Sequence, residues 1–307
     1  MNSCDRCKEA PVIFLRYSGQ HLCGLHFLEL LKRRIKKEMR SQGTIWKRDR
    51  IGVALSGGKD SVLALRTISE IVGDSRDKEI VALTIDEGIA GYRGSSIDIC
   101  KDITEDLGVQ WELSSFRELF GMDLDEMVKR SNIGPCTICG ILRRHALNTA
   151  AKRAEVDIMV TGHNLDDMSQ TILMNVMAAD LKRLARLGPH FNPISGFIPR
   201  SMPLRTTPET ETYLASLLLG LPIHEPECPY ARTAKRGEFR DLLLKAEENT
   251  PGTRHSLLRF QEQVTPLIPK NGVNTIPCRK CGEPVVNPYG DPLCKTCELL
   301  HELGVHN

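Results

Sequence analysis

Cysteine is the residue type whose spacing says most about chemistry in this chain, which contains eleven cysteines. Seven of them and one histidine fall into pairs separated by two residues, a spacing that forms a tight turn and brings both side chains to one tetrahedral Zn²⁺. The first set is Cys4, Cys7, Cys23 and His26, and the second set is Cys278, Cys281, Cys294 and Cys297. Four ligands close the shell of a metal, so we predict two structural zinc sites that stabilise short chain segments.

A second feature with chemical meaning is the run Ala54-Leu55-Ser56-Gly57-Gly58-Lys59-Asp60-Ser61, which begins at the end of a short apolar segment. It is not a Walker A loop, because the residues between the first glycine of that motif and its Gly-Lys-Ser/Thr end are missing. Its glycines leave backbone N–H groups open, its serines add hydroxyls, and a helix is expected to begin near Asp60. We predict an anion cradle in which Asp60 either holds a bridging Mg²⁺ or only caps the helix.

Four cysteines lie outside the two zinc sets. Cys100 falls in an amphipathic run and is expected to be a small buried apolar residue. Cys136 and Cys139 lie at the start of an expected helix that carries Arg143, where the positive helix end favours thiolates. Cys228 lies between prolines in an extended segment. These last three thiols fit a [4Fe–4S] cluster with one open iron, a persulfide-carrying dithiol system, or no chemical role.

The segments that must position these residues alternate between two kinds. Short, mostly apolar runs predict strands over 51–55, 80–85, 109–113 and 157–161, with helical periodicity between them. This alternation predicts a doubly wound α/β domain with a parallel sheet over roughly 48–180, whose ligands lie beyond the carboxyl ends of the strands. Further helical segments are expected over 25–41, 209–219 and 238–264, and proline-rich loops follow residue 188.

The net charge is only +2, but its distribution is uneven. Residues 32–50 contain nine Lys or Arg against Glu38 and Asp49, and residues 231–240 contain four against Glu238. Each segment is either a solvated helix face or a contact surface for a polyanion, in which every neutralised phosphate adds salt-dependent affinity.

Length and composition are typical of a globular protein, with 307 residues, 41% hydrophobic and 26% charged. No run approaches the about 18 apolar residues of a membrane helix. The charged start MNSCDRCKEA does not fit a secretion signal, so we expect a cytoplasmic protein with no membrane contact. We predict an N-terminal zinc finger over 1–30, a catalytic domain with a basic linking helix over 31–270, and a C-terminal zinc ribbon over 271–307.

The run Ser56–Ser61 closely resembles the fingerprint of the PP-loop ATP pyrophosphatases, which cleave ATP between the α- and β-phosphates. In this interpretation the strand over 80–85 lies beside the first strand. The backbone of Thr84 and Ile85 is then expected to hold an adenine edge.

The segment Gly162-His163-Asn164-Leu165-Asp166-Asp167 resembles the second signature of PP-loop enzymes that modify tRNA bases. That resemblance implies that Gly162 and Asp167 line the nucleotide site. Taken by itself, the pair of carboxylates also fits the cap of a helix.

Six motifs in order, over nearly the whole chain, resemble the tRNA 2-thiouridine synthetases of the TtuA/NcsA group. They are the N-terminal CxxC…CxxH set, SGGKDS, PCTICGxxRR, GHNLDD, ECPY and the C-terminal CxxC…CxxC set. The resemblance implies that Cys136, Cys139 and Cys228 hold an oxygen-sensitive [4Fe–4S] cluster and that the protein is a homodimer. CTICGILRRHAL is more similar to the branch that thiolates the wobble uridine at tRNA position 34. The branch acting at position 54 typically has Lys in place of Arg143.

The implied chemistry starts from the C2 oxygen of uracil, which is a poor leaving group. This oxygen attacks the α-phosphorus of ATP while the glycine loop and Mg²⁺ stabilise the departing pyrophosphate; sulfide then adds at C2 and AMP leaves. We expect Asp60 to position the metal or pyrophosphate, and Lys59 and Arg143 to stabilise charge. The target base must be unstacked, which is easiest in an anticodon loop, and the basic helix and zinc modules are expected to grip the tRNA.

Other functions remain open at this point. They are the same chemistry at position 54, a persulfide relay without a cluster, a PP-loop ligase that uses ammonia, and a zinc-ribbon RNA-binding protein, which leaves SGGKDS unexplained. The sulfur donor is either a ubiquitin-like thiocarboxylate carrier or inorganic sulfide. Replacing Cys228 by Ala separates these classes, since only a thiolase needs that thiol.

Overall fold

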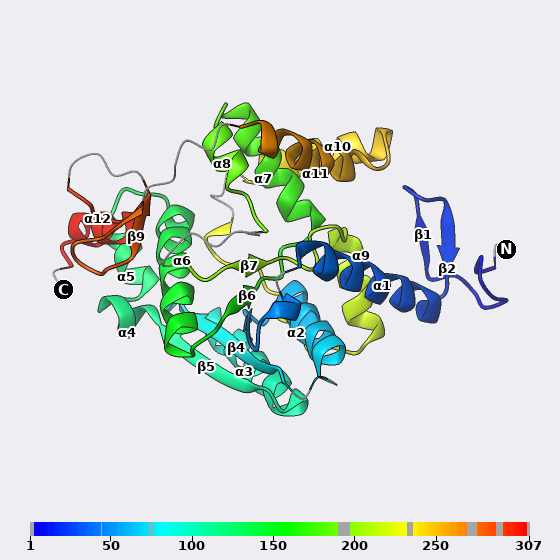
Figure 1. Ribbon diagram of the computed structural model, residues 1–307, viewed down its shortest axis with the longest axis horizontal. Coiled ribbons are helices and arrows are strands. Elements are labelled where there is room, and N and C mark those ends of the chain that lie inside the picture. Colours follow the sequence, from blue (N-terminus) through cyan, green and yellow to red (C-terminus); the bar gives the residue numbers. More distant parts are fainter. Residues whose placement is uncertain are drawn as a thin grey trace.

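The computed structural model describes residues 3–43, 45–73, 75, 77–189, 197–231, 236–268, 275–286 and 291–305. At its centre lies a five-stranded parallel sheet with the order β5-β4-β3-β6-β7 (Figure 1). The strands are β3 (Arg50–Ala54), β4 (Glu79–Asp86), β5 (Gln110–Ser115), β6 (Ile158–Val160) and β7 (Arg200–Ser201). The predicted α/β fold with a doubly wound parallel sheet is confirmed.

The strand order reverses at β3, the first strand of this sheet along the chain. β4 and β5 extend the sheet on one side of β3, and β6 and β7 extend it on the other, so a topological switch point lies between β3 and β6. Val53 pairs with both Ala82 and Val160, and the strand ends therefore meet at one edge. Ligands of such sheets bind at this edge. The glycine loop follows Ala54 and the GHNLDD segment follows β6, so both start there.

Both faces of the sheet are buried, because successive residues of a strand point to opposite faces. Ile158 and Val160 of β6 belong to one hydrophobic cluster, whereas Met159 belongs to the other. The first cluster contains side chains of α1 (Gly24–Gln42), α2 (Lys59–Val72) and α3 (Arg93–Leu107). The second contains side chains of α4 (Phe116–Phe120), α5 (Leu124–Lys129), α6 (Pro135–Arg153) and α12 (Lys295–Glu302). Cys100 is fully buried in the first cluster, as predicted.

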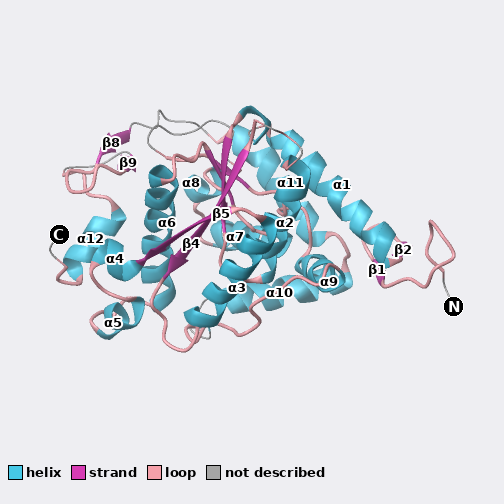
Figure 2. Ribbon diagram, turned by 90° about the horizontal axis from the view of Figure 1, so that it is seen from below, coloured by secondary structure: helices cyan, strands magenta, loops and turns pink. Residues whose placement is uncertain are grey.

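A group of helices covers the β6–β7 side of the sheet (Figures 1 and 2). They are α7 (Leu165–Met177), α8 (Leu181–Ala185), α10 (Arg236–Asn249) and α11 (Thr253–Val264), whereas α9 (Glu209–Leu218) packs against α2. The helical segment expected over 238–264 is thus two helices. They are separated at Gly252, whose φ of +96° interrupts the helix. Short 3-10 turns lie at Ile45–Lys47 and Thr265–Leu267.

Two small cysteine-containing modules lie at opposite ends of the molecule (Figures 1 and 2). The N-terminal module contains the antiparallel pair β1 (Ile13–Leu15) and β2 (Gln20–Leu22), and the C-terminal module contains β8 (Thr275–Pro277) and β9 (Pro284–Val286). The helix α1 runs without a break through the boundary predicted at residue 30. The domain boundaries at 30 and 270 stay predictions.

Four elements of the sheet domain had no clear signal in the sequence. These are the short helices α4, α5 and α8 and the strand β7, which has only two residues. Elements this short show no periodicity, and β7 forms because its backbone completes the ladder of β6. Residues 190–196 and 232–235, which include parts of a proline-rich loop and of the second basic segment, lie outside the described residues.

Among the described residues, none of the helices combines the length and apolar character needed to cross a lipid bilayer.

Candidate functional site

The glycine loop joins β3 to α2 and leaves the N-terminus of the helix without a cap. Gly57 has φ +83°, and a Cβ there would lie 2.5 Å from the carbonyl oxygen of Ser96, so no side chain fits. Gly58 is the N-cap of α2 and makes no side-chain cap hydrogen bond. Ser61 Oγ donates to the Gly58 carbonyl at 2.9 Å and lies 3.1 Å from Ser56 Oγ, which fixes the shape of the loop. Uncapped helix N-termini of this kind bind anions in proteins.

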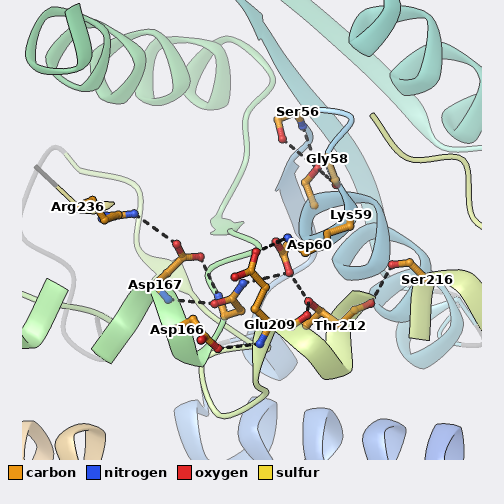
Figure 3. Close-up of polar contacts among 12 residues, drawn as sticks. Ser56, Gly58, Lys59, Asp60, Asp166, Asp167, Glu209, Thr212, Ser216 and Arg236 are labelled. Atoms are coloured by element: carbon orange, nitrogen blue, oxygen red, sulfur yellow. Dashed lines mark hydrogen bonds and ion pairs between the residues drawn. The ribbon is translucent and has the colours of Figure 1, made fainter. Parts of the chain in front are cut away.

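The carboxylate of Asp60 lies where three elements meet beside this loop (Figure 3). Its Oδ1 accepts hydrogen bonds from Thr212 of α9 at 2.6 Å and from Asn164 at 3.2 Å, and its Oδ2 lies 3.1 Å from Lys59 Nζ. Lys59 also lies 2.7 Å from Glu209 of α9. Burial raises the pKa of Asp60, although Lys59 opposes the shift. Two of these partners, Thr212 and Asn164, lie outside α2, so Asp60 ties the first turn of this helix to its neighbours.

The GHNLDD segment packs directly onto the glycine loop. A Cβ on Gly162 would lie 2.8 Å from the carbonyl carbon of Asp60 and 2.9 Å from the nitrogen of Ser61, so the two loops touch through the missing side chain. Asn164 Oδ1 accepts from the N–H of Asp167 at 3.0 Å, and Asp167 Oδ2 accepts from the N–H of Asn164 at 3.2 Å. The helix-cap interpretation of this segment is therefore confirmed for Asp167 at the start of α7. The other oxygen of this carboxylate, Oδ1, takes no part in the cap and lies 3.3 Å from Arg236 Nη1.

Arginines from both basic segments have partners inside the molecule. Arg34, from the first segment, lies 2.6 Å from the buried carboxylate of Glu211. Arg236, from the second, lies 3.3 Å from Asp167 Oδ1 and donates to Thr171 Oγ1 at 3.1 Å (Figure 3). Arg34 is therefore largely withdrawn from solvent, whereas Arg236 stays exposed while it pairs with Asp167. Arg236 is a cation beside the expected nucleotide site that the sequence analysis did not single out.

The structure places the three predicted sulfur ligands around the start of α6. Cys136 is the second residue of this helix, and its Sγ donates to the carbonyl of Tyr230 at 3.6 Å. Tyr230 follows Cys228 by two residues, and Cys139, Cys228 and Tyr230 belong to the same hydrophobic cluster. Cys139 Sγ accepts a hydrogen bond from Arg143 at 3.2 Å. Segments from distant parts of the chain therefore bring the three thiols into one region.

These three thiols are not arranged for a single ion. Over the part of the chain that the structure describes, the sets whose ligand atoms all lie within 4.8 Å of one another are the two terminal sets, and Cys136, Cys139 and Cys228 are not such a set. A cluster of several irons is larger than one ion, so its ligands stand further apart. The donor types and their wider spacing fit such a cluster.

The thiol of Cys139 does not show the lowered pKa expected from its helix end. Burial raises the pKa of Cys139 to about 11, and Glu87, Cys228 and Cys136 add to the shift while Arg143 opposes it. The expectation of a thiolate is therefore wrong for Cys139 without a bound metal. Desolvation of the charge outweighs the helix end.

A buried carboxylate, Glu87, connects the cysteines to the glycine loop. Its Oε1 lies 2.6 Å from Arg143 Nε, and its Oε2 lies 2.7 Å from Arg93 Nε. Arg93 in turn donates to the carbonyl oxygens of Ser56 at 3.1 Å and of Ile85 at 2.5 Å. The carbonyl of Ile85, expected to hold an adenine edge, is thus already hydrogen-bonded to Arg93.

Both terminal sets have the geometry of closed metal sites. In each set all four ligand atoms lie within 4.8 Å of one another; the sets are Cys4, Cys7, Cys23, His26 and Cys278, Cys281, Cys294, Cys297. His26 Nδ1 lies 3.4 Å from Cys4 Sγ and 3.3 Å from Cys23 Sγ, and Cys281 Sγ lies 3.5 Å from Cys294 Sγ. Ligands of one tetrahedral Zn²⁺ stand about 3–4 Å apart, given bonds of ~2.0–2.3 Å. Each set therefore fits one tetrahedral ion.

Comparison with known proteins agrees with this geometry. The PP-loop domain model matches residues 28–192, and the model of the N-terminal LIM domain of 2-thiouridine synthetase TtuA matches residues 3–28. The tRNA 2-thiolation protein NcsA of Haloferax volcanii is 38% identical, with 98% of both chains covered. The chain belongs to the PP-loop tRNA 2-thiolation enzymes.

Other relatives match nearly the whole chain at lower identity. The cytoplasmic tRNA 2-thiolation protein 1 of Dictyostelium discoideum is 31% identical, with 98% of this chain and 83% of that protein covered. The solved structure of the U34-tRNA thiolase NcsA from Methanococcus maripaludis with its [4Fe-4S] cluster superposes with a TM-score of 0.87 at 29% identity. The match covers 100% of this chain and 98% of the chain of the Methanococcus maripaludis protein.

Several residues of the site were not found from the sequence. Thr212 and Glu209, which hold Asp60 and Lys59, lie on a helix with no motif of its own. Glu87 and Arg93 lie after β4, and the adjacent acids Asp86 and Glu87 at the end of this strand were the one available signal. Their partners are set by the packing of the sheet rather than by local spacing.

Proposed function

We propose that this protein is an ATP-dependent tRNA sulfurtransferase that replaces the C2 oxygen of a uridine, the wobble uridine at position 34, by sulfur. The observation that carries the proposal is the chain of contacts from Cys139 through Arg143, Glu87 and Arg93 to Ser56. It joins a loop suited to a nucleotide to thiols suited to sulfur chemistry. A reaction that needs both ATP and sulfur at one atom uses such a joint site.

The glycine loop serves the first step. The uridine C2 oxygen forms a bond to the α-phosphorus of ATP, the bond between that phosphorus and the bridging oxygen breaks, and pyrophosphate leaves as N3 loses its proton. Charge grows on the pyrophosphate, and the uncapped start of α2 together with Lys59 stabilises it. The oxygens of Asp60 suit Mg²⁺, which prefers one or two carboxylates plus phosphate oxygens.

The cysteines serve the second step. Hydrosulfide sulfur bonds to C2, its proton passes to N3, and the C2–oxygen bond breaks, so AMP leaves with the former uridine oxygen. Cys136, Cys139 and Cys228 would hold a [4Fe–4S] cluster, which supplies an open iron where hydrosulfide can bind. Arg143 lies beside this region with 48% of its side chain exposed, and it donates a hydrogen bond to Cys139.

The remaining assignments rest on the resemblance and on the modules. Position 34 is supported by Arg143, by the CTICGILRRHAL stretch, and by the name of the U34-tRNA thiolase whose fold this chain shares. Zn²⁺ is the metal that best suits a set of four cysteines and a set of three cysteines with one histidine. We further propose a cytoplasmic homodimer supplied with sulfur by a thiocarboxylate carrier or by inorganic sulfide.

The test is anaerobic purification followed by assays with tRNA, ATP and sulfide. We expect AMP and pyrophosphate to form only when tRNA is present, and nucleoside mass spectrometry to detect 2-thiouridine at position 34. Cys228→Ser should abolish 2-thiouridine but retain tRNA-dependent AMP formation. Cys100→Ala, which alters a core cysteine away from the triad, is the matched control and should keep both activities.

Each alternative predicts a different result in these assays. An ammonia-using ligase would tolerate Cys228→Ser, and thiolation at position 54 would move the modified nucleoside. A persulfide relay would leave thiolation intact in protein that contains no iron. Absence of AMP formation by the wild-type protein with tRNA would contradict the proposal itself.

A further inference from the structure

The carboxylate of Glu87 is nearly completely buried, although one of its two cationic partners is not. Glu87 is 3% exposed and Arg93 is 5% exposed, whereas the side chain of Arg143 keeps 48% of its surface exposed. Removing a carboxylate from water is costly, and an exposed arginine has little need of a buried counter-charge. The arrangement is therefore a poor way to gain stability, but it fixes the direction of the Arg143 guanidinium.

The two arginines carry this constraint to different parts of the site. Arg93 holds the carbonyl of Ser56 at 3.1 Å and the hydroxyl of Ser96 at 2.9 Å. The backbone of Ser96 in turn closes against Gly57 of the loop. Arg143 uses Nε for Glu87 and Nη2 for Cys139, so its plane is set by two contacts. The carboxylate of Glu87 thus orients both Arg93, which holds the nucleotide loop, and Arg143, which donates to the sulfur of Cys139.

We propose that Glu87 is a positioning residue that holds Arg93 on the glycine loop and Arg143 on Cys139, so that the nucleotide and sulfur halves of the site keep a fixed mutual geometry. This rests on the proposed function for the reaction that the two halves share. Without the negative charge, two guanidinium groups would face one neutral amide. Arg143, the exposed one, then turns to solvent.

The test is a double-mutant cycle with Glu87→Gln, which nearly preserves side-chain volume, and Arg143→Gln, which removes the guanidinium. Single-turnover formation of 2-thiouridine should slow by about tenfold or more in Glu87→Gln. With ATP saturating, so that weaker binding through Arg93 does not limit the rate, the same change in the Arg143→Gln background should slow it by no more than about twofold. The residue through which Glu87 acts on the sulfur side is already gone there. If the rate reductions of the two substitutions multiply in the double variant, Glu87 does not act through Arg143, and this half of the proposal is overturned. Thermal unfolding of the wild type, the two single variants and the double variant serves to check that each protein folds.

A second readout needs neither iron nor turnover. ATP binding to the iron-free protein should weaken several-fold in Glu87→Gln, through Arg93, and stay unchanged in Arg143→Gln. Equal ATP binding in wild type and Glu87→Gln would overturn the loop half of the proposal. Glu87→Asp should restore part of both effects, since it keeps the charge.

The controls separate this proposal from the proposed function. Glu79→Gln changes an exposed acid that pairs with Arg50 at the other end of β4, and it should leave both readouts unchanged. If the wild-type protein binds ATP but forms no 2-thiouridine, the proposed function fails. The ATP arm still decides whether Glu87 positions Arg93.

Discussion

The hydroxyl of Tyr17 donates a 2.7 Å hydrogen bond to Glu211, and this contact ties the N-terminal cysteine module to α9. Tyr17 follows β1 of the module, and Glu211 precedes Thr212, the residue that holds Asp60. Arg34 of α1 completes the contact at 2.6 Å from Glu211. A module at one end of the molecule therefore supports a helix that supplies side chains to the nucleotide site.

Tyr17→Phe should destabilise the protein through this contact. The pKa of Tyr17 is raised by burial and by Glu211, so the hydroxyl stays a donor near neutral pH. Loss of one hydrogen bond to a carboxylate costs about 1.5–3 kcal/mol in the free energy of unfolding. Urea unfolding measures it. Tyr213→Phe, on the exposed side of the same helix, should change little, and equal losses in the two variants would show that the Tyr17 contact has no special weight.

Asp60→Asn should strongly slow ATP cleavage yet stabilise the metal-free protein. Losing the carboxylate should slow AMP formation by about 10²–10³-fold, the usual effect of removing one electrostatic group. Burial raises the pKa of Asp60 in the folded state above its ordinary 3.8, so the folded protein binds this proton more tightly than the unfolded chain does. The stability of the fold therefore falls as the pH rises from 3.8 to the raised pKa. Asp60→Asn has no carboxyl group that ionises at this position, so it avoids this loss of stability.

The check is the melting temperature in EDTA as a function of pH. Asp60→Asn should melt higher than wild type at neutral pH, and the difference should shrink as the pH approaches 4. Asp98→Asn, an exposed carboxylate on α3, is the control for AMP formation and for melting. A variant that melts lower than wild type at neutral pH contradicts the direction of the shift.

Gly162→Ala should disturb the nucleotide site without touching any ligand. The added Cβ would lie 2.8 Å from the backbone of Asp60, and backbone atoms cannot turn aside as a flexible side chain can. Overpacking of this kind costs about 1–3 kcal/mol, and here it displaces the start of α2, so ATP binding should weaken. Calorimetric titration with ATP measures this. Gly140→Ala, where a Cβ meets nothing within 4 Å, should bind ATP normally.

Metal content should separate the two kinds of cysteine set. We expect two zinc ions per chain, one for each closed set, and Cys281→Ser should reduce this to one because the C-terminal set loses a ligand. Its iron content should not change. Cys139→Ser should do the reverse, with iron lost and zinc kept. Elemental analysis after anaerobic reconstitution measures both metals, and loss of zinc in Cys139→Ser would mean that the sets are wrongly divided.

The fold and the chemically active segments could be predicted from the sequence because their signals are local. Two-residue spacing makes Cys278 and Cys281 neighbours in a turn whatever surrounds them, and such pairs build the closed geometry of both terminal sets. The glycines and serines of the loop before α2, and the strands around it, are likewise encoded within a few residues. The predicted strands match β3 to β6 to within two residues at each end.

Only the tertiary structure decided which side chains meet. Thr212 is 152 residues from Asp60 in the sequence, yet it donates to that carboxylate because α9 packs beside the switch point of the sheet. Glu87 bridges Arg93 and Arg143 because β4 ends between α3 and α6. The raised pKa of Cys139 has the same origin, since burial is a property of the packed molecule. Such contacts depend on strand order and helix packing, which no local spacing encodes.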